Sequence, residues 1–140
     1  MRAKPIHAVL AAALVIGARP AVGCELDITI QPAKGGATLY GQVFADAATF
    51  PKVNGGIVAF TLAPNSTTAV AIKALPAGRY AVAAFEDTKG TGKLDKNFLG
   101  VPTEPYGFSN DATGTFGPPS FDQAAVDCRG DPVVVTIHLH

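Results

Sequence analysis

The strongest constraint on the fold is a series of short segments in which apolar and polar residues alternate, separated by residues that favour turns. In the first segment, Leu26, Ile28 and Ile30 alternate with polar neighbours until Pro32 interrupts the pattern. A period of two is typical of a strand that buries one face. After residue 23 no segment shows the three-to-four-residue apolar period of an amphipathic helix. The pattern therefore predicts an all-β domain.

Further strands are expected in later segments that lie between residues favouring turns. A single helical turn could follow the second strand at residues 46–51, and Gly41 within that strand marks a bulge or a close approach. About seven short strands with frequent turns predict a two-sheet antiparallel β-sandwich of the immunoglobulin or transthyretin kind, with a small β-barrel as the alternative. The segments expected as strands are residues 25–31, 37–45, 56–63, 67–75, 79–85, 124–128 and 133–139.

Residues 1–23 have the composition of a signal peptide. Arg2 and Lys4 form a basic start, an apolar core follows at residues 8–17, and Ala21 and Gly23 are small residues near the end. The apolar core is too short to span a bilayer, and no later segment is long and apolar enough. We therefore expect an exported protein, periplasmic or secreted, with no transmembrane segment and a single domain at residues 24–140.

The charge balance changes once the signal peptide is removed. The whole chain has 11 basic and 11 acidic residues, and the first 23 residues contain three of the basic ones, Arg2, Lys4 and Arg19, and no acidic one. The mature chain is therefore net acidic. Binding to nucleic acid requires basic side chains that neutralise phosphates, so a nucleic-acid partner is not expected.

The two cysteines, Cys24 and Cys128, allow three interpretations. In an oxidising compartment an even pair is most simply one disulfide, and this is the prediction. Alternatively, residues 21–24 form a lipoprotein cleavage box, so that Cys24 becomes the lipidated first residue. This alternative is weaker because the strand pattern starts at Glu25 and leaves no flexible tether. Two unpaired thiols are the third interpretation.

The run from residue 78 to residue 120 contains a long glycine- and proline-rich stretch without a strand or helix pattern. Loops of this length are usually functional or disordered, and the aromatic residues argue against disorder. Within it, Tyr106, Phe108, Ser109 and Asn110 could bind a sugar or a peptide through aromatic and hydrogen-bonding groups. The competing interpretation, which we favour, is that Tyr106 and Phe108 close the open end of the sandwich while Asn110 makes a turn.

Catalytic patterns are sparse, so an enzyme is not expected. None of the serines of the mature chain lies in a nucleophile-elbow context. His138 and His140 fall on the strand face opposite to the apolar residues, which predicts exposure to solvent. A hydrolase that uses Asp87 or Glu104 as acid or base is kept as a distant alternative.

Four blocks, in this order, carry a resemblance to a known family. They are residues 75–82 (LPAGRYAV), 87–95 (DTKGTGKLD), 100–110 (GVPTEPYGFSN) and 117–121 (GPPSF). The sequence resembles an uncharacterised family of exported bacterial proteins, domain of unknown function 2141 (DUF2141). The resemblance implies an exported β-sandwich domain and implies no particular activity.

The acidic block at residues 87–95 is a degenerate version of a loop that resembles a calcium site in the family. Oxygen ligands at alternate positions around a turn can converge on a hard cation. Here Lys89 replaces one oxygen donor, which leaves Asp87, Thr91 and Asp95 as the candidate calcium ligands. The favoured interpretation is instead that Lys89 or Lys93 lies near Asp87 and Asp95 and supplies the positive charge.

Together these features predict an exported, non-catalytic β-sandwich module of the cell envelope or extracellular space. Its expected partner is an envelope polysaccharide or a protein, bound through the stretch between residues 86 and 119. No cofactor is expected. A calcium-stabilised structural domain is the first alternative and a carboxylate-dependent hydrolase the second.

Overall fold

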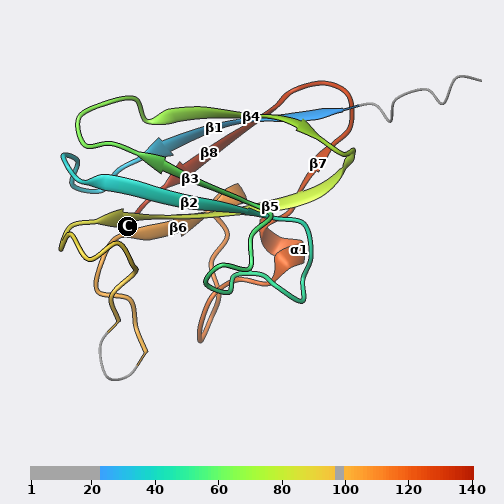
Figure 1. The fold of residues 1–140 in the computed structure, drawn as a ribbon. Coiled ribbons are helices and arrows are strands. Elements are labelled where there is room, and N and C mark those ends of the chain that lie inside the picture. The colour runs from blue at the N-terminus through green and yellow to red at the C-terminus, as the bar shows by residue number, and fades with distance from the viewer. Residues whose placement is uncertain (1–22, 97–99) are drawn as a thin grey trace, which may run out of the picture.

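The computed structural model describes residues 23–96 and 100–140, which contain eight strands and one short helix (Figure 1). The signal peptide expected at residues 1–23 lies, except for Gly23, outside the described residues. The elements are β1 (Cys24–Gln31), β2 (Thr38–Phe44), β3 (Val58–Leu62), β4 (Ala69–Leu75), β5 (Gly78–Asp87), β6 (Tyr106–Phe108), a 3-10 turn (Ser109–Asp111), α1 (Phe121–Ala124), β7 (Val126–Cys128) and β8 (Val133–His138).

The strands form two packed sheets, which confirms the all-β sandwich and not the closed barrel. One sheet has the order β4-β1-β8, and the other has the order β3-β2-β5-β6 with β7 also paired to β5. Figure 1 shows these as an upper and a lower layer. Two details differ from the expectation. β6 lies in the stretch expected to be irregular, because its three residues pair with β5, and β1 pairs with β8 in parallel.

The main core lies between the sheets and is built from the alternate residues that the sequence pattern predicts. Leu26, Ile28 and Ile30 of β1 are fully buried, and Val135 and Ile137 of β8 lie beside them. The intervening residues of β8 face solvent, as expected for His138. This alternation is the physical reason that a one-sided strand pattern specifies a sandwich.

A second apolar cluster covers the outer face of the five-stranded sheet. Phe44, Ala81 and Phe108 extend from β2, β5 and β6, and Phe50 and Ala124 cover them. Because β5 contributes side chains to both clusters, it is buried on both faces, as its apolar sequence predicts. The helical turn expected at residues 46–51 is confirmed as a single turn: the N–H of Phe50 donates to the carbonyl of Asp46, four residues earlier, at 3.2 Å, and the turn places Phe50 in the cluster.

Periodicity does not predict α1, because the helix is a single short turn. A capping box defines its start: the Ser120 side chain accepts from the Gln123 backbone, and the Gln123 side chain accepts from the Ser120 backbone.

The close approach expected at Gly41 is confirmed. A Cβ atom at Gly41 would lie 2.1 Å from Cζ of Phe60, so the ring of Phe60 packs directly on the glycine.

A disulfide between Cys24 and Cys128 joins β1 of one sheet to β7, which pairs with β5 of the other. Their Cα atoms are 5.4 Å apart and 104 residues separate them along the chain. Both residues are buried in the main core.

Within the described ranges, 23–96 and 100–140, no helix is long and apolar enough to cross a membrane.

Removing the disulfide should destabilise the domain strongly. With Cys24 and Cys128 both changed to alanine, the free energy of unfolding should fall by about 2–5 kcal/mol, because the unfolded chain regains the entropy of a long loop. Urea denaturation of the wild type and the variant measures the difference. Reductant should lower the midpoint of the wild type to that of the variant and leave the variant unchanged, and equal midpoints throughout would contradict the prediction.

Candidate binding site

Three carboxylates are buried near one end of the sandwich, where β5 ends. Glu86 and Asp87 are the last residues of β5, and Glu104 lies two residues before β6. All three side chains belong to buried residues, and Glu86 has an exposed fraction of 0%. A buried carboxylate is costly unless hydrogen bonds satisfy its oxygens, so the partners of these groups determine how the end of the domain is built.

Glu86 binds the loop between β1 and β2 through backbone amides. Its Oε1 accepts from the N–H of Ala33 at 2.8 Å and of Lys34 at 3.1 Å, and its Oε2 accepts from Gly35 at 2.9 Å. Gly35 and Gly36 have φ values of 78° and 77°, which glycine adopts without strain. Consecutive amides that converge on an anion in this way form a nest, here occupied by the protein's own carboxylate.

Asp87 and Glu104 fold the loop after β5 in the same way. The two oxygens of Asp87 accept from the N–H of Thr91 at 3.1 Å and of Gly92 at 2.9 Å. Glu104 accepts from the N–H of Lys89 and of Asp95, each at 3.0 Å. Glu104 therefore ties residues 89 and 95 of the loop to the segment just before β6.

The prediction that a lysine neutralises Asp87 and Asp95 is wrong. The Nζ of Lys89 donates to Oγ1 of Thr103 at 2.9 Å, and within the described residues neither Lys89 nor Lys93 forms an ion pair with either aspartate. Backbone N–H groups donate to Asp87 instead, and the hydroxyl of Thr91 donates to Asp95. Spacing alone could not show this, because every residue of a loop carries an amide whatever its side chain.

The candidate calcium ligands come together, but they bind one another and the loop. Oγ1 of Thr91 lies 3.1 Å from Oδ2 of Asp95, and the N–H of Thr91 donates to Asp87. In the part of the chain that the structure describes, no group of three or more His, Cys, Asp or Glu side chains is placed to hold a metal ion. Calcium binding at Asp87, Thr91 and Asp95 stays a prediction.

All four candidate ligand-binding residues have partners within the protein, and Tyr106, which packs against the second cluster, is described below with His140. Phe108 is buried in the second cluster. Oγ of the fully buried Ser109 accepts from the N–H of Val82 at 2.8 Å and donates to the carbonyl of Ala124. Nδ2 of Asn110 donates to the carbonyls of Gln123 and Ala125, at 3.2 and 2.9 Å. These contacts anchor α1 and the 3-10 turn against β5.

Asp111 joins the 3-10 turn to β8. Its Oδ1 accepts from the N–H of His138 at 2.9 Å, and its Oδ2 lies 2.8 Å from Nδ1 of the same histidine. The backbone N–H of His138 is the main cause that lowers the pKa of Asp111 below the ordinary aspartate range. The turn expected at Asn110 is therefore only part of the arrangement, because Asn110 and Asp111 also bind segments that are distant in the chain.

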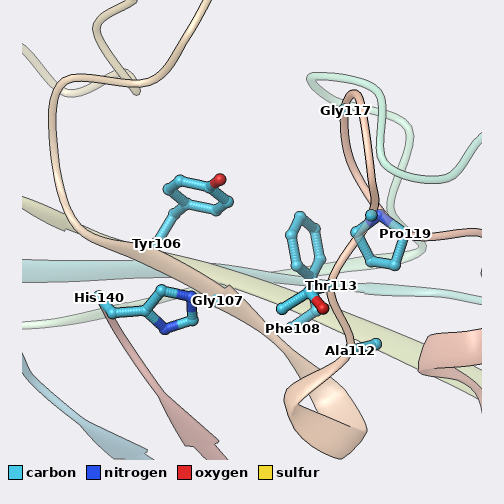
Figure 2. A pocket seen from close by; sticks show the side chains of 9 residues that line it. Tyr106, Gly107, Phe108, Ala112, Thr113, Gly117, Pro119 and His140 are labelled. Atoms are coloured by element: carbon cyan, nitrogen blue, oxygen red, sulfur yellow. The ribbon is translucent and has the colours of Figure 1, made fainter.

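Tyr106, the fourth candidate, lies beside His140 where the two sheets meet. The N–H of each residue donates to the carbonyl of the other at 3.2 Å, and their ring centroids are 6.2 Å apart. Tyr106 is half-buried and His140 exposed. Figure 2 shows the two side chains on one side of a pocket, with Phe108 and Pro119 across from them.

Two shallow pockets share Tyr106 and His140 in their walls. The first has a volume of about 50 Å³ and continues to Thr113, Gly114 and Gly117 (Figure 2). The second has a volume of about 240 Å³ and adds Lys34, Thr103 and Glu104 to its lining. Aromatic rings with hydroxyl and amino groups around them can hold a polar ligand by stacking and hydrogen bonding.

A comparison with known protein families matches residues 29–136 to the family described as "Uncharacterized protein conserved in bacteria (DUF2141)". The chain belongs to the DUF2141 family. This confirms the resemblance carried by the four sequence blocks, all of which lie within the match. No curated protein and no solved structure matches the chain. The likeness to immunoglobulin or transthyretin sandwiches therefore stays a prediction.

Sequence reasoning did not identify His140, Lys34, Thr103 or Thr113 as residues of the two pockets of this DUF2141 protein. The alternation of the last strand places His140 on a solvent-facing side, which is correct, but its pairing with Tyr106 crosses between sheets and has no local signal. Lys34 lies in a loop whose position depends on the Glu86 carboxylate. Neither placement is readable from residue spacing.

Glu86→Gln should destabilise the domain. The introduced side-chain NH₂ group would face the backbone N–H donors of residues 33–35 and leave some of them unpaired, at a cost of about 1–3 kcal/mol. Chemical denaturation measures the change. Asp131→Asn, at an exposed residue of the turn before β8, removes an equal charge and should leave stability unchanged. Equal losses in both variants would show that the Glu86 nest is unimportant.

Ser109→Ala should also destabilise the domain, because it leaves the N–H of Val82 and the carbonyl of Ala124 without their buried partner. We expect a loss of about 1–3 kcal/mol. Hydrogen exchange should show faster exchange of the Val82 amide. Ser66→Ala, in an exposed turn, is the matched control. A Ser109 variant as stable as the wild type would mean that its hydroxyl has no structural role.

Proposed function

We propose that this DUF2141 protein is an exported, non-catalytic module that binds an envelope polysaccharide through the surface around Tyr106 and His140. The observation that carries the proposal is that these two adjacent rings line both pockets. A sugar ring offers an apolar C–H face to an aromatic ring and hydroxyls to Lys34, Thr103 and Thr113. The shallow walls suit a chain that lies along the surface.

The buried carboxylates support a binding role over a catalytic one. A general acid or base must reach the proton it transfers. Glu86 and Asp87 are buried, and Glu104 is buried at the wall of the second pocket. All three accept hydrogen bonds from loop amides, so their observed contacts are those of structural groups. Ser109 is likewise fully buried. Export is supported by the basic and apolar segments within residues 1–23 and by the resemblance to an exported family.

The choice between a polysaccharide and a protein partner rests on the size of the site. Stable protein interfaces bury roughly 800 Å² on each partner and contain a packed apolar centre. The surface around Tyr106 and His140 consists instead of two small hollows with polar groups at their edges. The larger hollow, with a volume of about 240 Å³, can take a single sugar unit, and the smaller one extends the surface beside it.

Affinity electrophoresis through gels that contain bacterial envelope polysaccharides tests this function. We expect at least one polysaccharide to retard the wild type, and Tyr106→Ala and His140→Ala to weaken the interaction roughly tenfold, as loss of one aromatic contact implies. Phe108→Ala is unsuitable as a test because Phe108 is part of the second cluster.

Tyr40→Ala is the matched control for this experiment. Tyr40 is also half-buried and stacks on Phe85, but it lines neither pocket. Circular dichroism checks that each variant is folded. Retardation that is unchanged in both Tyr106→Ala and His140→Ala would contradict the proposed site. If no polysaccharide retards the wild type and the wild type binds only a protein partner, the proposed ligand is wrong.

A further inference from the structure

Two loops project from the outer face of the five-stranded sheet, on the side of α1. One joins β2 to β3 and the other joins the 3-10 turn to α1, and both views show them side by side (Figures 1 and 2). Each carries an exposed apolar residue: Val53 has an exposed fraction of 81% and Phe116 one of 102%. A completely exposed phenylalanine is unusual and requires an explanation, since isolated apolar exposure is ordinarily partial.

The loop that carries Phe116 is a narrow hairpin whose two limbs touch. A Cβ atom at Gly114 would lie 2.1 Å from the carbonyl oxygen of Gly117 and 2.6 Å from that of Pro118. Only glycine fits at this position, and Pro118 and Pro119 restrict the returning limb. The backbone therefore holds Phe116 outward, where it has no core to join.

The loop that carries Val53 is held by its own hydrogen bonds and by the second cluster. The N–H of Lys52 donates to the carbonyl of Thr49 at 2.8 Å, and the N–H of Gly55 donates to the carbonyl of Lys52 at 2.9 Å. Phe50 inserts into the cluster and contacts Phe108 and Phe121 edge to face. The inserted Phe50 and the exposed Val53 thus occupy opposite sides of one ordered loop.

The charge of the two loops differs from that of the mature chain. The loop between β2 and β3, residues 45–57, contains one acidic residue, Asp46, directly after β2 and one basic residue, Lys52, next to Val53, and the loop at residues 112–120 contains no charged residue. Lys52 is therefore the charged side chain nearest to the apolar tips in sequence. The mature chain as a whole is net acidic. An apolar pair of tips with an adjacent lysine is complementary to a surface that is anionic outside and apolar beneath.

We propose that the tips at Val53 and Phe116 form a contact site for phospholipid membranes that contain anionic lipid. Phe116 and Val53 enter the boundary between headgroups and acyl chains, and Lys52 lies near headgroup phosphates. A bilayer fits this geometry because narrow convex tips can enter a fluid surface, whereas a protein partner must supply a matching hollow for each tip. Phe116 and Val53 line neither pocket, although the loop that carries Phe116 forms part of the wall of the first pocket through Thr113, Gly114 and Gly117. The membrane proposal rests on the exposed tips and does not depend on the polysaccharide proposal.

Tryptophan fluorescence gives a direct test, because the chain contains no tryptophan. Phe116→Trp should show a blue shift of its emission when vesicles of phosphatidylcholine mixed with phosphatidylglycerol are added, and brominated lipid should quench it. Val134→Trp is the matched control. Val134 is also exposed, at 70%, but it lies on β8 in the other sheet, so its replacement should show neither effect.

Vesicle flotation measures the contribution of each residue in the otherwise unchanged protein. Phe116→Ser should lower the fraction bound to the mixed vesicles roughly tenfold, from the free energy of burying an aromatic side chain, and Val53→Ser should lower it less. Val134→Ser should have no effect. Lys52→Glu should weaken binding to the mixed vesicles and leave the weaker binding to pure phosphatidylcholine nearly unchanged.

Three outcomes would overturn the membrane proposal. The first is an unshifted Phe116→Trp emission with vesicles, and the second is flotation that Phe116→Ser leaves unchanged. The third is a blue shift that appears without lipid and grows with protein concentration, which would assign the tips to self-association. Because Phe116 and Val53 lie outside both cores, their variants should fold like the wild type, and circular dichroism verifies this.

Discussion

The hydrogen bonds from three consecutive backbone amides to the carboxylate of Glu86 are the interaction on which this end of the domain depends. A fully buried carboxylate needs several donors, and only a loop wrapped around it can supply them. Asp87 and Glu104 repeat the solution with the loop that follows β5. These hydrogen bonds place Lys34, Thr103 and Tyr106 in the lining of the second pocket, although the three residues belong to separate segments of the chain. The acidic residues that suggested a metal or catalytic role thus build the scaffold of the proposed binding site.

β5 connects this end of the molecule to the membrane-contact tips. It is the central strand of its sheet and carries apolar side chains on both faces, so it supports the main core and the second cluster at once. Ser109 and Asn110 attach the 3-10 turn and α1 to the outer side, and Phe50 brings in the neighbouring loop. Because the second cluster buries Phe44, Phe50 and Phe108 and holds Phe121 against it, the outward placement of Val53 and Phe116 is a property of the fold and not of excess apolar sequence.

Much of the fold was predictable from local sequence, and the failures have physical causes. Strand positions, the close approach at Gly41, the double burial of β5 and the pairing of Cys24 with Cys128 follow from alternation, turn residues and cysteine count. β6 was missed because three residues are too few to show a period, and they become a strand only by pairing with β5. The lysine prediction failed because backbone amides, which no residue pattern reveals, donate to Asp87, and the Thr91 hydroxyl donates to Asp95.

By itself, the sequence determined the all-β class and the family. It also determined the set of polar and aromatic side chains near Asp87 and Tyr106 that could bind a ligand. These properties depend on residue type and short spacing, which a linear pattern records. Only the tertiary structure decided which of those residues remain available. It turned Glu86, Asp87, Glu104 and Ser109 inward to bind amides and carbonyls, joined Tyr106 to His140 across the two sheets, and left Phe116 in solvent. The reason is that burial and hydrogen-bond partners are set by segments distant in the chain, and their meeting is a consequence of the whole fold.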